Sequence, residues 1–247
     1  MAELYKENRR TPGKPRSSMI QLRPHQLDAV KACKVERYGT VTDTCGSGKS
    51  YVEDELIFDA FDNGANVVIY GAHRLDLILQ QKRSLLRYGE SRHNPYFYTD
   101  ARKDFIILEV SSADREHDST TVITEIISAI DSAIKLDQKL LIYVCFASAQ
   151  RLYEALKKFT GKAADLVVMD EAHYGNMSIN EADQEFNRHM FKNVAKRMYF
   201  FTATPTDLTI NNHGVESMPV IHQYNYGDAL KDGTVLPFTI HWLTDVD

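Results

Sequence analysis

Two short strings of residues have the types and spacing needed to handle a nucleoside triphosphate. The first is Thr44-Cys45-Gly46-Ser47-Gly48-Lys49-Ser50, and the second is Asp170-Glu171-Ala172-His173, directly after the apolar run Leu166-Val167-Val168-Met169. Glycines let a backbone turn tightly around a phosphate, and the N–H groups at the start of a helix favour anionic oxygens. Acids at the end of a buried strand suit a phosphate-bound metal. Together the two strings predict ATP binding and hydrolysis.

The reactive side chains of these strings have distinct expected roles. Lys49 is expected to reach the β- and γ-phosphates, and Ser50 to bind Mg²⁺. Asp170 is expected to hold the same Mg²⁺, directly or through water, while Glu171 polarises the attacking water as general base. The usual loop pattern begins with glycine, whereas this chain has Asp43 there. The assignment therefore also depends on a strand before the loop and a helix after it.

Apolar runs alternate with amphipathic segments along most of the chain. Strands are expected at 39–42, 66–70, 105–110, 140–145, 166–169 and 198–201, with a last one at 235–243. Helices are expected at 24–33, 50–61, 75–87, 121–136, 148–159 and 181–194, and the isoleucines between 123 and 134 are expected in the core. This alternation predicts an α/β fold, with a parallel sheet covered by helices on both faces.

Composition excludes several classes of protein. The 247 residues carry a formal net charge of −5, so any nucleic-acid surface must come from local patches. The three cysteines, Cys33, Cys45 and Cys145, are odd in number and lack Cys-x-x-Cys spacing. This pattern argues against structural zinc and against a set of disulfides, and it suits a protein of a reducing compartment. No stretch approaches the ~20 apolar residues of a membrane span, and no signal peptide is evident. We expect a cytoplasmic protein of a bacterium or phage-infected cell, or a nuclear one, and not a secreted or membrane protein.

Several strings, in their order along the chain, resemble the first ATPase domain of superfamily 2 helicases and translocases. The group is DEAD/DEAH-like and includes restriction-subunit and phage helicases. The matching strings are 22–26 (LRPHQ), 46–50 (GSGKS), 72–74 (AHR) with Leu77 and Gln80, 146–148 (FAS), 170–173 (DEAH) and 201–205 (FTATP). The resemblance implies a single RecA-like P-loop domain at 19–235. A flexible basic leader at 1–18 is expected before it, and 236–247 is expected to lead toward a second RecA-like domain that this chain lacks.

The same resemblance implies roles for individual residues. For the nucleotide, it implies binding by Arg23, Gln26, Cys45, Gly46, Ser47, Gly48, Lys49 and Ser50, with Gln26 reading adenine. For catalysis it implies Lys49, Asp170, Glu171 and His173. For the nucleic-acid strand it implies His73, Arg74 and Ser148, and for coupling of ATP state to strand grip it implies Thr202 and Thr204. Simpler roles stay open: a solvated amide for Gln26, a surface cation for Arg74, a helix cap for Ser148 and ordinary strand positions for the threonines.

The function expected from this resemblance is a nucleic-acid-dependent ATPase motor, with DNA favoured and RNA as the alternative partner. In this family a second RecA-like domain, in cis or in trans, supplies arginines to the γ-phosphate. The isolated chain is therefore expected to bind ATP and Mg²⁺ but to be nearly inactive. Two other interpretations are a non-motor, nucleotide-gated docking module and a small-molecule kinase. In a kinase the strings at 72–74 and 201–205 would have no role.

Overall fold

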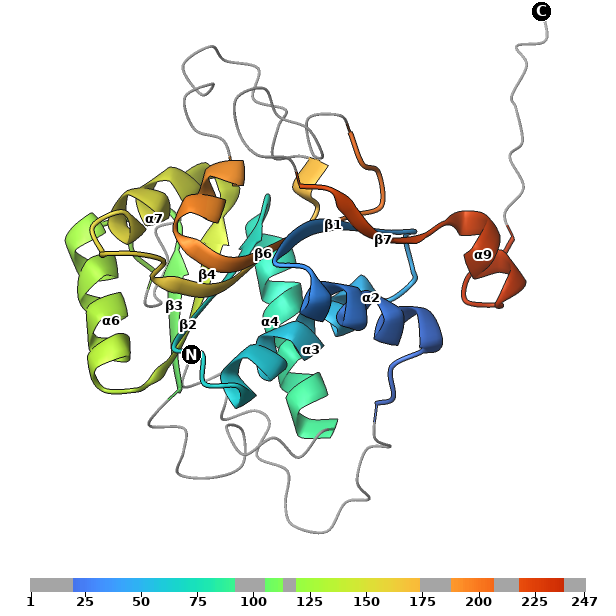
Figure 1. The fold of residues 1–247 in the computed structure, drawn as a ribbon, viewed down its shortest axis with the longest axis horizontal. Coiled ribbons are helices and arrows are strands. Elements are labelled where there is room, and N and C mark those ends of the chain that lie inside the picture. Colours follow the sequence, from blue (N-terminus) through green and yellow to red (C-terminus); the bar gives the residue numbers. More distant parts are fainter. Residues whose placement is uncertain (1–19, 92–104, 113–118, 174–187, 207–217, 238–247) are drawn as a thin grey trace, which may run out of the picture.

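A computed structural model describes residues 20–91, 105–112, 119–173, 188–206 and 218–237 of this chain. They form a 7-stranded sheet with the order β3-β4-β2-β5-β6-β1-β7, and every paired strand runs parallel to its neighbour (Figure 1). The strands are β1 (Tyr38–Asp43), β2 (Val67–Ala72), β3 (Phe105–Val110), β4 (Lys139–Cys145), β5 (Ala164–Met169), β6 (Ala195–Thr202) and β7 (Val220–Tyr224). The predicted α/β class with a parallel sheet is confirmed.

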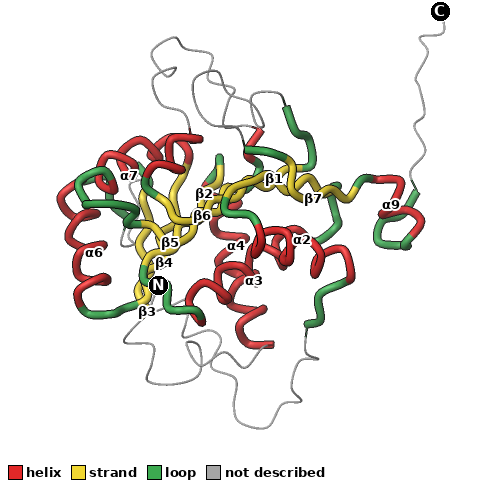
Figure 2. The backbone as a smooth tube through the Cα atoms, viewed as in Figure 1, coloured by secondary structure: helices red, strands yellow, loops and turns green. Residues whose placement is uncertain are grey.

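Helices cover both faces of the sheet (Figures 1 and 2). They are α2 (Pro24–Val35), α3 (Lys49–Asp62), α4 (Leu75–Ser91), α6 (Ile123–Lys135), α7 (Ala149–Leu156) and α9 (Tyr226–Lys231), with the 3₁₀ helices η2 (Phe146–Ser148) and η5 (Arg188–Asn193). Along β2, Val67 and Ile69 pack into the core under α6 and α7, whereas Val68 and Tyr70 pack into the core under α2, α3 and α4. Successive side chains of a strand point to opposite faces, so one apolar run supplies both cores.

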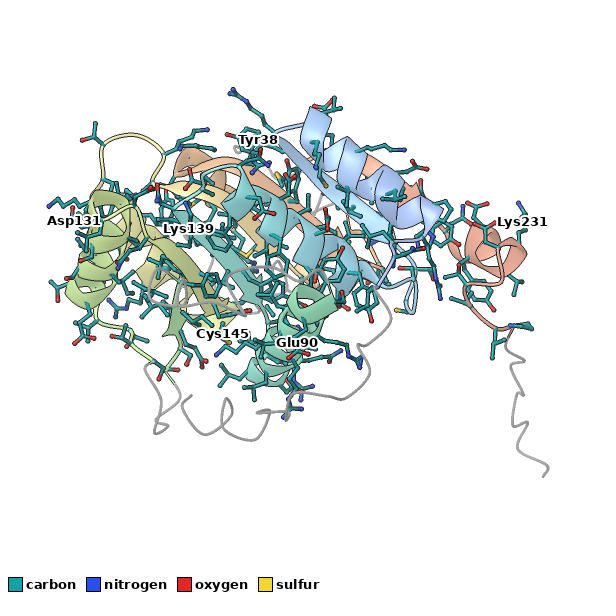
Figure 3. All side chains as sticks on the ribbon, turned by 90° about the horizontal axis from the view of Figure 1, so that it is seen from below. Tyr38, Glu90, Asp131, Lys139, Cys145 and Lys231 are labelled. Carbon is teal, nitrogen blue, oxygen red and sulfur yellow. The ribbon has the colours of Figure 1, made fainter. Side chains whose placement is uncertain are left out.

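The sheet lies between the two helical layers, and α2 reaches as far as the edge strand β7 (Figure 1). Figure 3, seen from below, places Asp131 of α6 and Lys231 of α9 at opposite ends of the molecule. The central strand β2 is buried along its whole length. Burying each large aliphatic side chain contributes about 1.5–3 kcal/mol. This two-sided burial gives the loops at the carboxyl ends of the strands a rigid support. Within the described part of the chain, no helix is long and apolar enough to span a bilayer.

The structure corrects several sequence predictions at element boundaries. The helix expected at 181–194 is, in its described part, only the short 3₁₀ helix η5, because the chain turns into β6 at Ala195. The helix expected at 148–159 ends at Leu156, and the helix expected to stop at Arg87 continues to Ser91. Ile134 is 43% exposed and lies outside the core, unlike Ile126 and Ile130.

The C-terminal part of the domain also differs from expectation. Strand β7 was missed because its residues alternate weakly and include the polar pair His222-Gln223 at the sheet edge. The prediction of a strand at 235–243 is wrong for residues 235–237, which follow α9 and do not form a strand. The rest of that segment lies outside the described residues, as does the predicted leader at 1–18.

Candidate active site

The predicted motif residues gather along one edge of the sheet, where the parallel strands end. Following the strand order, the edge carries 146–148 after β4, 73–74 after β2, 170–173 after β5, 202–204 at β6, and 44–50 after β1. The strings assigned to a nucleic-acid strand thus lie at one half of the edge. The glycine loop lies at the other half, and the strings 170–173 and 202–204 lie between them. Ligands of open α/β sheets bind at this edge.

The glycine loop has the backbone conformation of a phosphate cradle. Gly46 and Gly48 have φ angles of 78° and 87°, in the left-handed region that only glycine adopts without a steric penalty. Helix α3 begins directly after Gly48 at Lys49, so its N-terminal N–H groups face the loop. Cys45 and Gly46 are exposed, while Ser47 is buried beneath them. The tip of the loop is therefore open to solvent.

Helix α2 braces this loop from behind. The Gln26 amide nitrogen donates to the carbonyl oxygens of Ser47 and Gly48, each at 3.1 Å, and its oxygen accepts from the Arg23 backbone N–H at 2.8 Å. The His25 ring is also hydrogen-bonded to the Ser47 carbonyl, at 3.0 Å. Gln26 is 3% exposed, so it is not a solvated amide. An added Cβ on Gly48 would lie 2.5 Å from the Gln26 nitrogen, so glycine is needed for this contact.

Lys49 lies among the acids predicted to share the site. Its ammonium donates to the backbone oxygen of Asp43 at 3.0 Å, and this contact holds the ammonium at the carboxyl end of β1. The same ammonium favours the ionised form of Asp170 and opposes the rise in the pKa of that carboxyl. Lys49 and Asp170 therefore act on one another across the end of β6. This is the convergence that the two sequence strings require.

Asp170 is held by groups on two strands. Its Oδ2 accepts from the Tyr70 hydroxyl at 3.2 Å, and its Oδ1 accepts from the backbone N–H of Glu171 at 2.8 Å. Burial, and next the charge of Glu171, raise the pKa of the Asp170 carboxyl above its usual range. Glu171 itself has a φ of 49°, unusual for a residue with a Cβ. Such strain costs about 1–3 kcal/mol and is concentrated at functional sites.

A chain of polar contacts links Glu171 to the next strand of the sheet. His173 Nδ1 lies 2.9 Å from the Thr202 hydroxyl and 3.3 Å from Glu171 Oε2. The Thr202 hydroxyl in turn accepts from the backbone N–H of Thr204 at 3.1 Å. Thr202 is buried and Thr204 is exposed, so the chain leads from inside the site to the surface. These contacts join the ends of β5 and β6.

The residues predicted to contact nucleic acid differ in their accessibility. The Arg74 side chain is 66% exposed and pairs with Asp76 at 3.2 Å. His73 lies close to His173 and Asp170, and burial, followed by the charge of Arg74, lowers its pKa. Ser148 is 4% exposed and is the N-cap residue of α7, although its side chain makes no capping hydrogen bond. Arg74 is therefore the most exposed member of this set, His73 is partly exposed, and Ser148 is buried.

The oxygen ligands present are those that Mg²⁺ prefers. Ser50 lies in the first turn of α3, and Asp170 supplies a carboxyl across the site. Within the described ranges, no group of three or more His, Cys, Asp or Glu residues is placed to hold a metal by itself.

Sequence reasoning missed several residues around this site. They are Tyr70, which holds Asp170; His25, which supports the glycine loop; Tyr224, stacked on the His25 ring at 3.9 Å between centroids; and Glu53, buried in α3. Glu53 had a detectable signal, because it follows Lys49 by four residues on the face of the helix that must pack against the sheet. The other three needed the tertiary structure.

The sheet order, the glycine loop and the paired acids define a RecA-like ATPase domain of the helicase kind. A model of the family described as "Type III restriction enzyme, res subunit" matches residues 19–207, well over half of the chain. The chain belongs to this family. It is the N-terminal type of RecA-like domain found in superfamily 2 helicases. A comparison with curated proteins gave no match.

Two solved structures of restriction-modification enzymes share the fold. One is a nuclease-deletion mutant of the Type ISP enzyme LlaGI in complex with a DNA substrate mimic, with a TM-score of 0.60 and 20% identity over 87% of this chain. The other is the ATP-dependent Type ISP enzyme LlaBIII bound to DNA, with a TM-score of 0.62 and 17% identity over 87% of this chain. The match covers only 21% and 16% of those two chains.

Proposed function

We propose that this chain is the ATP-binding half of a nucleic-acid-dependent motor, with DNA favoured over RNA. The observation that supports this most directly is the order of functional strings along the sheet edge, with the His173–Thr202 contact between the glycine loop and the Arg74 side. The AHR and TAT strings also resemble those of DNA translocases. The solved relatives LlaGI and LlaBIII were captured with DNA or a DNA mimic.

In the proposed mechanism the glycine loop binds the triphosphate through its backbone N–H groups. Lys49 neutralises charge on the β- and γ-phosphates. Its ammonium lies at the carboxyl end of β1, next to the glycine loop, which is a suitable position for this role. Ser50 and Asp170 are the residues that would hold Mg²⁺, which when bound offsets phosphate charge. Glu171 orients the attacking water and accepts its proton. Its contact with His173 connects that step to Thr202.

A second RecA-like domain, in cis or in trans, completes hydrolysis in this proposal. In related phosphoryl-transfer enzymes an arginine that reaches the γ-phosphate raises the rate by about 10³–10⁵. That factor corresponds to about 4–7 kcal/mol of barrier, at about 1.4 kcal/mol per tenfold. Lys49 and Glu171 do not replace it. We therefore expect the chain by itself to bind nucleotide and to turn it over very slowly.

The test exploits the reciprocity of coupled binding, which needs no turnover. A fluorescent, non-hydrolysable ATP analogue is titrated in Mg²⁺, alone and with single- or double-stranded DNA and RNA. We expect saturable binding that DNA shifts by several-fold and RNA shifts less, and Lys49→Ala weakens it by at least about tenfold. Nucleotide binding that no nucleic acid affects would favour the docking module. No nucleotide binding by the wild-type chain would reject the ATPase assignment.

A further inference from the structure

Glu53 is a buried acid that the proposed mechanism leaves without a role. It lies in α3 and is 0% exposed, and within the described part of the chain no N–H or O–H group donates to its carboxyl oxygens, which lie against the carboxyl of Asp170. Its neighbour Asp54 is equally buried but fully paired, because Gln81 and Ser84 each donate to it at 2.7 Å. One helix therefore carries two inaccessible acids, of which only one is explained by packing.

An unpaired buried carboxyl destabilises the folded state. The group loses its hydration and gains no N–H donor from the protein in exchange. Burial, and then the nearby carboxyls of Asp170 and Asp54, raise the pKa of Glu53, while Lys49 opposes the rise. Unsatisfied buried polar groups are rare in native proteins, and they often have a functional explanation. The neighbours of Glu53 indicate where to look for one.

Those neighbours belong to the metal side of the nucleotide site. Helical spacing places Glu53 on the same side of α3 as Lys49 and Ser50, four and three residues earlier. Across from α3, Asp170 is the charge that acts most strongly on Glu53. Tyr70, which donates to Asp170, also feels the charge of Glu53. The Glu53 carboxyl is thus close enough to the Asp170 carboxyl for a hydrogen bond between them when one of the two is protonated.

We propose that Glu53 is a positioning residue that fixes the Asp170 carboxyl and so strengthens binding of the divalent metal that accompanies the nucleotide. This inference rests on the proposed ATPase function, because Asp170 and Ser50 are the expected metal ligands there. Groups that orient a metal ligand commonly change metal affinity by 10- to 100-fold when removed. Glu53 is suited to such a role because its polar oxygens have no other protein partner to serve.

The experiment compares Glu53→Met, which keeps the length of the side chain without its oxygens, with Glu53→Gln, which keeps polar atoms. Binding of the fluorescent ATP analogue is titrated against Mg²⁺, and Mn²⁺ bound in the ternary complex is counted by electron paramagnetic resonance. We expect Glu53→Met to raise the Mg²⁺ concentration for half-maximal binding about tenfold or more. We also expect its Tm to rise, because the cost of the buried carboxyl is gone. Glu53→Gln should restore metal dependence to near the wild-type value.

Asp54→Asn is the matched control, since it alters the adjacent buried acid of the same helix. It should change Tm but leave the half-maximal Mg²⁺ concentration unchanged. If Glu53→Met is more stable but has unchanged metal dependence, Glu53 has no role in metal binding. The proposed ATPase function would still stand in that case, provided that the wild-type chain binds the nucleotide analogue. If Glu53→Met unfolds, Glu53→Leu takes its place, and a half-maximal Mg²⁺ concentration of that variant equal to that of Asp54→Asn overturns the proposal.

Discussion

His173 Nδ1 lies 2.9 Å from the Thr202 hydroxyl, and this contact joins two strands that meet at the centre of the functional edge. Strand β5 ends at the acids Asp170 and Glu171, and β6, which carries Thr202, separates β5 from the strand of the glycine loop. The same imidazole nitrogen is 3.3 Å from Glu171 Oε2. If Glu171 acts as the proposed general base, its movement would be transmitted to β6 through this ring.

The first prediction concerns this connection. Thr202→Val removes the hydroxyl and keeps the shape, so it should abolish the effect of DNA on nucleotide affinity while nucleotide binding itself changes less than about threefold. His173→Ala should give the same loss. The double variant should be no worse than either single variant, because both remove one contact. Fluorescence titrations with and without DNA measure this, and additive losses would show that the two residues act separately.

The second prediction separates the base from the binding site. Glu171→Gln keeps the size of the side chain but cannot accept a proton, so hydrolysis should fall by about 10²–10⁴ while nucleotide affinity stays near the wild-type value. Single-turnover hydrolysis of radiolabelled ATP, with the second domain supplied if one is identified, provides the measurement. An unchanged rate would assign the base role to another residue.

The third prediction concerns the support of the glycine loop. Gln26→Ala removes the two hydrogen bonds to the carbonyls of Ser47 and Gly48, which keep only their contacts with the His25 ring and the Tyr51 backbone N–H. Losses of this kind cost about 1–3 kcal/mol, so nucleotide affinity should fall about tenfold or more. Gln150→Ala, at an exposed position of α7, is the control and should have no effect. If Gln26→Ala lowers the affinity for an adenine nucleotide and for a guanine nucleotide equally, Gln26 only supports the loop. A selective loss of affinity for the adenine nucleotide would show that Gln26 also recognises the base.

The sequence could predict that the motif residues gather at one edge of the sheet because these residues are tied to strand ends. Gly46, Gly48 and Lys49 are recognisable from their spacing, and Asp170 follows an apolar run that can only be a buried strand. Since parallel strands end at one edge, these distant residues had to converge. The order of the strands along that edge was not predictable, because it depends on which strands pair across the sheet.

The residues that sequence reasoning missed share one property: their role comes from partners far away in the chain. Tyr70 looks like any aromatic residue of a strand, and only the pairing of β2 with β5 brings its hydroxyl to Asp170. The stacking of Tyr224 on His25 depends on β7, whose polar edge pattern concealed it as a strand. The end of the helix expected at 181–194 also depends on distant partners. Packing of η5 against β6, and not helix propensity, decides where the chain turns into the strand.

The last prediction uses the buried acids to set the direction of a pH effect. Burial raises the pKa of Asp54 to about 8, even though hydrogen bonds from Ser84 and Gln81 lower it. An unfolded aspartate titrates near 3.9, so between about pH 4 and pH 8 the unfolded chain releases a proton that the folded chain keeps. The contribution of Asp54 to stability therefore falls as pH rises through this window, and it is constant above it. Burial raises the pKa of Asp43 to about 6, so the contribution of Asp43 to stability also falls as pH rises, over a narrower pH range.

Asp54→Asn isolates the larger of these effects, because the amide does not titrate. Between pH 5 and pH 8.5 the wild-type protein loses about 4 kcal/mol more than Asp54→Asn, at about 1.4 kcal/mol per pH unit below pH 8. Its Tm should therefore fall by about 8–16 °C more, since 1 kcal/mol corresponds to about 2–4 °C for a domain of this size. The comparison of the two curves cancels the opposite contributions of His73 and His222, whose pKa values are lowered by burial. Parallel curves would mean that Asp54 stays ionised in the folded state. The hydrogen bonds from Gln81 and Ser84 would then outweigh the desolvation of its charge.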